Sequence, residues 1–249
     1  MTADLYVETS PVGPVVRPRQ ASETVVLYVH SDWLLPKSSS PIPSTASRLA
    51  RDAQATVVCC GYRPSFPGSL EDVRAAFDYC ESRGRTVVAG ERLGAGLAAA
   101  LLLRLRDEDA APPYCGVLSS ALFDLTLEAP SLSLNAATDP KFDLAGLARR
   151  VRRYAAGAAP TNPLLSPLYG NLHGLPPIQL LVAGNDPLLD DSLAFASRAA
   201  RSGVAVDLRV RPVGAAPDEA AIAAMAGFIR AHTGAEPSRT DSTSRMISG

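Results

Sequence analysis

Short apolar segments alternate along this chain with longer stretches in which apolar residues recur at helical spacing. That alternation is typical of a parallel β-sheet with helices on both faces. The predicted strands are rich in Val and Leu and cover residues 24–30, 56–62, 85–90, 115–120, 178–184 and 206–212. All but the last are nearly continuous apolar runs, as expected for strands buried on both faces. Residues 4–8 and 12–17 could add a hairpin at one edge.

Helices are predicted between these strands. The segments with helical periodicity cover residues 44–53, 70–82, 93–106, 144–154, 189–202 and 218–232. Ser69, Glu71 and Asp72 suit the start of the second of these helices, because Ser and acidic residues stabilise the first turn. The helix over 93–106 is rich in Ala and Leu, so we expect it to be central and well buried.

One long stretch has no strand signal. Within residues 125–177 only a basic helix is predicted, so about 125–162 is expected to form a cap-like insertion over the carboxyl edge of the sheet. The chain is therefore predicted to form a single domain over residues 1–234. The polar residues 235–249 are expected to be a disordered tail.

Composition and charge narrow the choice of function. With 249 residues, 47% of them hydrophobic, the chain can bury one large core. Its formal net charge is -1 and its charges are scattered, so no face is expected to bind nucleic acid or a membrane surface. The most apolar run, residues 93–103, is too short to span a bilayer. The amino terminus has no signal-peptide pattern, so we expect a cytoplasmic protein.

The cysteines are Cys59, Cys60, Cys80 and Cys115, and none has metal-ligand spacing. Reduced, buried thiols are therefore the expectation. Cys59 and Cys60 lie in the middle of a predicted strand, so neither is expected to be a nucleophile. No metal or other cofactor is predicted.

Several segments, in order, resemble the hormone-sensitive-lipase group of esterases. The matching segments are VVLYVHSDW, CCGYRPSFPGSLEDVRAAFDYC, VVAGERLGAGLAAALLLRLRD, LSSALFDLT and NPLLSPLYGNLHGLPPIQLLVAGNDPLLDDSLAFASRAARSGVAVDL. The resemblance extends over about residues 25–228. It implies an α/β-hydrolase fold: a mostly parallel central sheet with helices on both faces and a reduced cap.

Esterases of this kind need a serine on a strained turn between a strand and a helix, and a histidine that takes its proton. An aspartate orients the histidine, and backbone N–H groups stabilise the oxyanion. The turn here reads Gly90-Glu91-Arg92-Leu93-Gly94, with Arg92 at the position of the nucleophile. A guanidinium stays protonated and cannot attack a carbonyl carbon. The resemblance therefore implies a member without the serine.

The acid is expected to remain, whereas the histidine is expected to be absent. Asp186, in the segment GNDPLL, matches the position of the orienting aspartate. Read without the resemblance, Asp186 could equally be a loop residue that caps the following helix. The histidine should follow the last predicted strand, but residues 212–218 read PVGAAPD. His232 lies too far along the chain to replace it.

The loop that supplies the oxyanion donors is also altered. His30 ends a predicted strand where the group has a His-Gly-Gly-Gly loop, and Ser31, Asp32 and Trp33 replace the glycines. Those glycines let backbone N–H groups point into the site. We expect the larger side chains to crowd the cleft. Asp32 could act as a general base if burial raised its pKa, and Trp33 could stack on a planar ligand or pack in the wall.

Arg92 is expected to project into the cleft at the amino end of the helix over 93–106, a position that suits an anion. It could bind a carboxylate or enolate of a ligand, or pair with Asp186. Alternatively it could form a local salt bridge with Glu91 that fills a vestigial pocket. The residues predicted to be catalytic are Arg92, Asp186 and Asp32. The residues predicted to bind the ligand are His30, Ser31, Trp33, Glu91 and Leu93.

Three functions remain open at this point. The first expectation is a non-hydrolytic biosynthetic enzyme, of cyclase, lyase or isomerase type, that acts on a small organic intermediate, which could be anionic. The second is a small-molecule receptor or a scaffold pseudoenzyme. The third is a residual carboxylic-ester hydrolase. In each case the expected partner is a small molecule, and a homodimer is left open.

Overall fold

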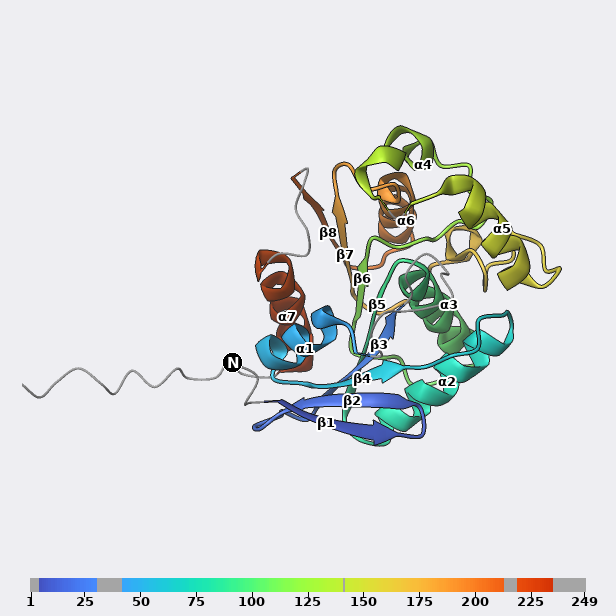
Figure 1. Ribbon diagram of the computed structural model, residues 1–249. Helices are drawn as coiled ribbons and strands as arrows, with labels where there is room; N and C mark the ends of the chain where they lie inside the picture. The colour runs from blue at the N-terminus through green and yellow to red at the C-terminus, as the bar shows by residue number, and fades with distance from the viewer. Residues whose placement is uncertain (1–4, 31–41, 141, 213–218, 235–249) are drawn as a thin grey trace, which may run out of the picture.

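The computed structural model describes residues 5–30, 42–140, 142–212 and 219–234. These residues form an eight-stranded sheet in the order β1-β2-β4-β3-β5-β6-β7-β8, covered by helices on both faces (Figure 1). The strands are β1 (Leu5–Ser10), β2 (Gly13–Pro18), β3 (Thr24–His30), β4 (Thr56–Cys60), β5 (Arg85–Glu91), β6 (Gly116–Ser119), β7 (Ile178–Ala183) and β8 (Val206–Arg211). The helices are α1 (Ser44–Ala53), α2 (Gly68–Glu81), α3 (Leu93–Asp107), α4 (Ser131–Leu134), α5 (Leu144–Ala155), α6 (Leu189–Arg201) and α7 (Glu219–Thr233). Two 3-10 turns, η1 (Ala136–Thr138) and η2 (Pro167–Tyr169), complete the described elements.

The sheet is mostly parallel, as predicted. Strand β3 pairs in parallel with β4 and β5, and parallel pairing continues through β6 and β7 to β8. Only the hairpin of β1 and β2 is antiparallel, both internally and where β2 meets β4. The predicted edge hairpin is therefore confirmed.

The central strand β3 shows why its sequence is a continuous apolar run. Leu27 and Val29 point into the cluster formed with α2, α3 and α6. Val26 and Tyr28 point into the opposite cluster, formed with α1 and α7. Figure 1 shows α1 and α7 on one side of the sheet and α2 and α3 on the other. Because successive side chains alternate between two buried faces, the positions from Val25 to Val29 are all hydrophobic, and only the two ends of the strand carry Thr24 and His30.

Strand β8 departs from this pattern because it forms the other edge of the sheet. Leu208 and Val210 are exposed, whereas the interior positions of the central strands β3, β5, β6 and β7 are buried. The mixed polarity predicted for residues 206–212 thus follows from an edge position.

The segment between β6 and β7 packs over the carboxyl end of the parallel strands (Figure 1). Leu147 and Val151 of α5 belong to one apolar cluster with Leu122, which follows β6. The same cluster contains Leu93, the first residue of α3, and Leu188, which precedes α6. Helix α5 turns its apolar face toward this cluster and leaves most of its arginines exposed.

Two local expectations differ from the structure. Ser69 does not cap α2: the helix begins at Gly68 without a side-chain cap, and the Ser69 hydroxyl hydrogen-bonds to the Tyr154 hydroxyl at 2.7 Å. Helix α4 was not predicted, because four residues are too few to show helical periodicity. Across the described ranges, the helices are too short or too polar to cross a bilayer.

Candidate active site

The turn between β5 and α3 holds Arg92 in a conformation that few side chains adopt. Strand β5 ends at Glu91, α3 begins at Leu93, and Arg92 between them has φ 55° and ψ -125°. The turn needs glycine on both sides: a Cβ on Gly90 would lie 2.8 Å from the Gly94 carbonyl oxygen, and one on Gly94 would lie 2.2 Å from that of Val29. Such close packing lets the strand reverse sharply into the helix and leaves Arg92 at the carboxyl edge of the sheet.

Arg92 is fixed by both its backbone and its side chain. Its N–H donates to the Ser119 carbonyl oxygen at 3.1 Å, and its own carbonyl oxygen accepts from the Leu122 N–H at 3.1 Å. The guanidinium Nη2 lies 3.1 Å from Oδ2 of Asp139, a residue of the segment that covers the site. Both side chains are largely but not fully buried, which strengthens their attraction relative to a surface pair.

The predicted local salt bridge between Arg92 and Glu91 is wrong. Glu91 turns toward the neighbouring strand, where one carboxylate oxygen contacts Nδ1 of His30. The buried Tyr28 hydroxyl lies close enough to Glu91 for that carboxylate to raise its pKa, although burial itself is the larger cause. His30 and Glu91 therefore form a pair of their own at the ends of β3 and β5.

From the described residues the Asp186 carboxylate accepts two hydrogen bonds, neither of them from Arg92, its predicted partner. Asp186 follows β7, and its Oδ2 accepts a hydrogen bond from the Ser120 hydroxyl at 2.7 Å. Its Oδ1 accepts from the Leu188 N–H at 2.8 Å, just ahead of α6. Asp186 thus orders the turn before α6 without capping the helix, which has no side-chain cap, and also presents an oxygen to the Ser120 hydroxyl at the carboxyl edge of the sheet.

Ser120 and Asp139 are the site residues that the sequence analysis missed. Ser120 directly follows β6 and has φ 44°, an uncommon conformation for a residue with a side chain. Ser120 is the second serine of LSSALFDLT, a segment that carries the resemblance but gives no sign that either of its serines belongs to the site. Asp139 lies in a stretch without periodicity, so no sequence signal placed it beside Arg92.

The segment between β6 and β7, here called the covering segment, also bonds to the loop that carries Asp186. The Asn135 side-chain amide donates to the Asp186 carbonyl oxygen at 3.0 Å, and the Thr138 hydroxyl donates to the Asn185 carbonyl oxygen at 2.7 Å. Together with the pair of Asp139 and Arg92, these contacts hold the covering segment at the carboxyl edge of the sheet. A cation, a hydroxyl and a carboxylate are thereby held at one edge of the sheet.

Other predicted site residues are placed differently or not at all. Leu93 is 3% exposed and packs in the apolar cluster under α5, so it supports the turn, and its contact with a ligand stays a prediction. Ser31, Asp32 and Trp33 lie outside the described residues, as do residues 213–218, where the histidine was sought. Among the described side chains no group of His, Cys, Asp and Glu has the arrangement of a metal site.

The cysteine thiols are buried and unpaired, as predicted. Burial raises the pKa of Cys59, Cys60, Cys80 and Cys115 to about 12 in each case. Because the thiolate is the reactive form, we expect no alkylation of the native protein by iodoacetamide at pH 8, and complete alkylation in guanidinium chloride. Mass spectrometry of the intact protein counts the adducts, and rapid native labelling would contradict the burial of these thiols.

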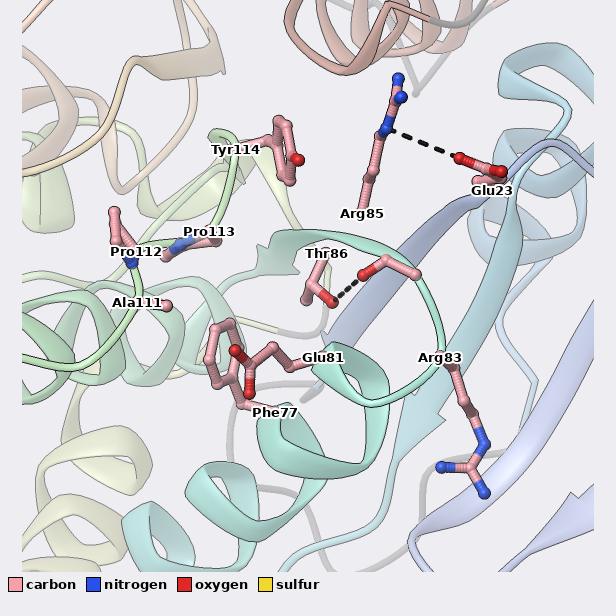
Figure 2. A pocket seen from close by; sticks show the side chains of 11 residues that line it. Glu23, Phe77, Glu81, Arg83, Arg85, Thr86, Ala111, Pro112, Pro113 and Tyr114 are labelled. Carbon is pink, nitrogen blue, oxygen red and sulfur yellow. Dashed lines mark hydrogen bonds and ion pairs between the residues drawn. The ribbon is translucent and has the colours of Figure 1, made fainter.

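A separate cavity of about 590 Å³ lies at the opposite end of the sheet (Figure 2). Its wall includes Arg85 and Thr86, which begin β5, whereas the candidate site lies where β5 ends. Arg85 is paired with Glu23 at 3.7 Å, and the Thr86 hydroxyl donates to the Gly84 carbonyl oxygen at 3.2 Å. This cavity is therefore distinct from the candidate site around Arg92 and Asp186.

Comparison with known proteins agrees with this fold. A family model described as alpha/beta hydrolase fold matches residues 26–213. An acetyl-hydrolase of Streptomyces hygroscopicus is 34% identical over 205 residues, which cover 79% of this chain and 69% of that protein. Esterase LipI of Mycobacterium tuberculosis is 33% identical over 230 residues, covering 82% and 71% respectively. A crystal structure of an esterase from the bacterial hormone-sensitive lipase family has a TM-score of 0.86 and 30% identity, covering 93% of this chain and 86% of that one.

These relatives correct the expectation about function. They are named as acetyl-hydrolase and esterase, and the similar structure is an esterase, so the expectation of a non-hydrolytic biosynthetic enzyme of cyclase type is wrong. The alternative of a pseudoenzyme conflicts with the same names. A carboxylic-ester hydrolase, the remaining alternative, is the function to which they point. The matched family model spans most of the chain, and the chain belongs to the alpha/beta hydrolase fold family.

Proposed function

We propose that this chain is a carboxylic-ester hydrolase in which a cation replaces the nucleophile at the turn after β5. The observation that carries the proposal is Arg92, held at the nucleophile's position with φ 55° at the amino end of α3. The proposal includes the absence of the usual serine and histidine: residues 212–218, PVGAAPD, contain no histidine. The relatives named as acetyl-hydrolase and esterase support the reaction class.

Arg92 can supply what the reaction needs most, a stabilised oxyanion. Attack on an ester carbonyl puts negative charge on the carbonyl oxygen, and a fixed guanidinium beside it favours that charge. The amino end of α3 adds a positive partial charge in the same place. Asp139 holds the guanidinium, so little reorganisation is needed when the charge develops.

The proposed substrates are esters of small acyl groups. One relative is named acetyl-hydrolase, and a similar structure, EstE5 (27% identical, TM-score 0.86), was soaked with p-nitrophenyl butyrate. Leu122, whose N–H bonds to the Arg92 carbonyl oxygen, belongs to an apolar cluster with Leu125 and Leu188, which makes the surroundings of the site apolar and suits a small acyl group. We also place the protein in the cytoplasm, which the four free cysteines support.

The test measures hydrolysis of p-nitrophenyl acetate and butyrate by the purified protein and by Arg92→Met. We expect slow turnover by the parent and a loss of about a hundred- to a thousandfold in kcat/KM in the variant, the usual effect of removing one oxyanion donor. Arg92→Lys, which keeps the charge, should retain part of the activity.

Arg17→Met is the matched control, because Arg17 is exposed on β2 and pairs only with Glu8 among the ion pairs described. It should leave turnover unchanged, and thermal melting checks that each variant folds. A parent protein that hydrolyses neither ester faster than buffer would overturn the proposal, and so would an Arg92→Met variant as active as the parent.

A further inference from the structure

We propose that Ser120 is the nucleophile of this hydrolase and that Asp186 accepts its proton. This inference rests on the proposed function and adds to it the two residues that would carry the covalent step. The residues come from strands β6 and β7, one and two strands away from the turn that carries Arg92.

The hydroxyl and the carboxylate already have the geometry of a proton transfer. The Ser120 hydroxyl donates to Oδ2 of Asp186 at 2.7 Å, within the range expected between a nucleophile and its base. The Leu188 N–H holds the other carboxylate oxygen at 2.8 Å, which fixes the plane of the carboxylate. Both residues are partly exposed, so a substrate can reach the hydroxyl.

The backbone holds Ser120 in an uncommon conformation at the end of its strand. Its φ is 44°, and its N–H donates to the Leu181 carbonyl oxygen at 2.7 Å. Non-glycine residues in this region of φ persist only when the surrounding structure holds them, and they occur often at active sites. Arg92, which follows the adjacent strand β5, has a positive φ as well.

The backbone on both sides of Ser120 is bonded to the backbone of Arg92. The Arg92 N–H bonds to Ser119 and the Arg92 carbonyl oxygen bonds to Leu122, so the short segment containing Ser120 is tied to Arg92 at both ends. In the proposed mechanism, the oxyanion formed when Ser120 attacks a carbonyl group faces the Arg92 guanidinium. Hydroxyl, carboxylate and cation together provide a nucleophile, a base and an oxyanion partner.

The reaction balances with these groups and water alone. The Ser120 oxygen forms a bond to the ester carbonyl carbon while its proton passes to Asp186, and the negative charge on the carbonyl oxygen faces Arg92. The bond to the alcohol oxygen then breaks, and the alcohol leaves with the proton from Asp186. Water attacks the acyl-serine and gives a proton to Asp186, and the carboxylic acid leaves as Ser120 recovers that proton.

The choice of base predicts a slow enzyme. An aspartate is ordinarily a much weaker base than the imidazole of a Ser-His-Asp triad, so less of the serine proton is transferred in the transition state. General base catalysis by a well-matched group is worth about a hundred- to ten-thousandfold, and part of that is lost here. Slow turnover with a covalent intermediate is the expected signature.

The experiment treats the parent protein with a fluorophosphonate, which bonds to a nucleophilic serine as fluoride leaves, and locates the adduct by peptide mass spectrometry. We expect one adduct, on the peptide that contains Ser120. Ser120→Ala should lose the adduct and at least about a hundredfold of the p-nitrophenyl acetate turnover. Ser119→Ala is the matched control and should keep both. Asp186→Asn should slow the labelling by a similar factor while Ser120 remains present.

The outcomes separate this inference from the proposed function. Turnover by the parent without an adduct on Ser120, or with an adduct on another serine, would overturn Ser120 as nucleophile and leave the hydrolase standing. Absence of both turnover and adduct would overturn both. The location of the adduct is read on the parent protein, so a Ser120→Ala variant that failed to fold would not remove the test.

Discussion

Gly94→Ala is expected to lower the free energy of unfolding by about 3 kcal/mol or more, because no space exists for a Cβ at this position. The new atom would lie 2.2 Å from the Val29 carbonyl oxygen and 2.6 Å from its carbonyl carbon. Both are backbone atoms of the central strand β3, which cannot rotate away as a side chain can. Helix α3 would have to move off the sheet, and the turn that carries Arg92 would move with it.

Thermal melting measures this effect, and for a protein of this size about 3 kcal/mol corresponds to a drop in Tm on the order of 10 °C. Gly227→Ala is the matched control. Gly227 lies within α7, and a Cβ there would have nothing within 4 Å. Alanine favours a helix over glycine by about 1 kcal/mol, so the control should melt at the same temperature or higher. A Gly94→Ala protein that melts with the parent would contradict the packing described for α3.

Asp191→Asn is expected to remove a large part of the pH dependence of stability between pH 4 and pH 7. Asp191 begins α6 with 1% of its surface exposed, and its Oδ2 accepts the N–H groups of Phe123 and Asp124. Burial raises the pKa of Asp191 to about 7 from an ordinary value of 3.8, although the two N–H donors act in the opposite direction. The carboxyl group therefore stays protonated in the folded protein at pH values where it ionises in the unfolded chain.

The sign of the effect follows from that difference in proton binding. Between about pH 4 and pH 7 the folded state holds a proton that the unfolded state has released, so stability falls as the pH rises. A shift of about 3 pH units corresponds to at most about 4 kcal/mol. An asparagine has no proton to lose, and its oxygen can accept from the same N–H groups, so the variant should lack this fall.

Urea unfolding from pH 4 to pH 8 measures this difference between the parent and Asp191→Asn. Other carboxylates titrate in both proteins and cancel in the comparison. Asp107→Asn serves as the control, because Asp107 is exposed at the end of α3 and pairs with the neighbouring Arg106. Parallel stability curves for the parent and Asp191→Asn would show that burial does not perturb Asp191 as described.

The Asp191 contact also has a consequence for the candidate site. Its two hydrogen bonds hold the backbone just after Ser120, which leads from β6 into the covering segment. Loss of those acceptors should loosen the segment that carries Ser120 and contacts Arg92. Asp191 therefore supports the position of the site from α6 without lying in it.

The elements of this fold were predictable from sequence because local rules and tertiary structure agree in it. Strands buried on both faces are apolar along their interior, as β3 is from Val25 to Val29, and an edge strand such as β8 need not be. Helices α1 and α3 begin where the sequence analysis placed them, because periodicity reports the buried face directly. The prediction failed where that signal was absent, in the four-residue helix α4, and at Ser69, where a tertiary contact replaced a cap.

The candidate site was predictable only in part. The order of motifs located Arg92 on its turn and Asp186 after β7, since both follow strands and are close to glycine or proline. Their partners were predicted incorrectly, because Arg92 pairs with Asp139 and Asp186 accepts from Ser120. Each of these contacts joins residues separated by dozens of positions in the chain, and no spacing rule reports which side chains meet at the edge of a sheet.

By itself, the sequence determined the class of fold and the unusual residue at the turn after β5, because apolar periodicity and short motifs are local properties. The sequence also places Arg92 on that turn and has no histidine in residues 212–218. Only the tertiary structure decided that Ser120 lies against Asp186 and that Asp139 holds the Arg92 guanidinium. Parallel strands bring their carboxyl ends to one edge whatever their separation along the chain, so the chemistry of that edge is set by packing between distant segments.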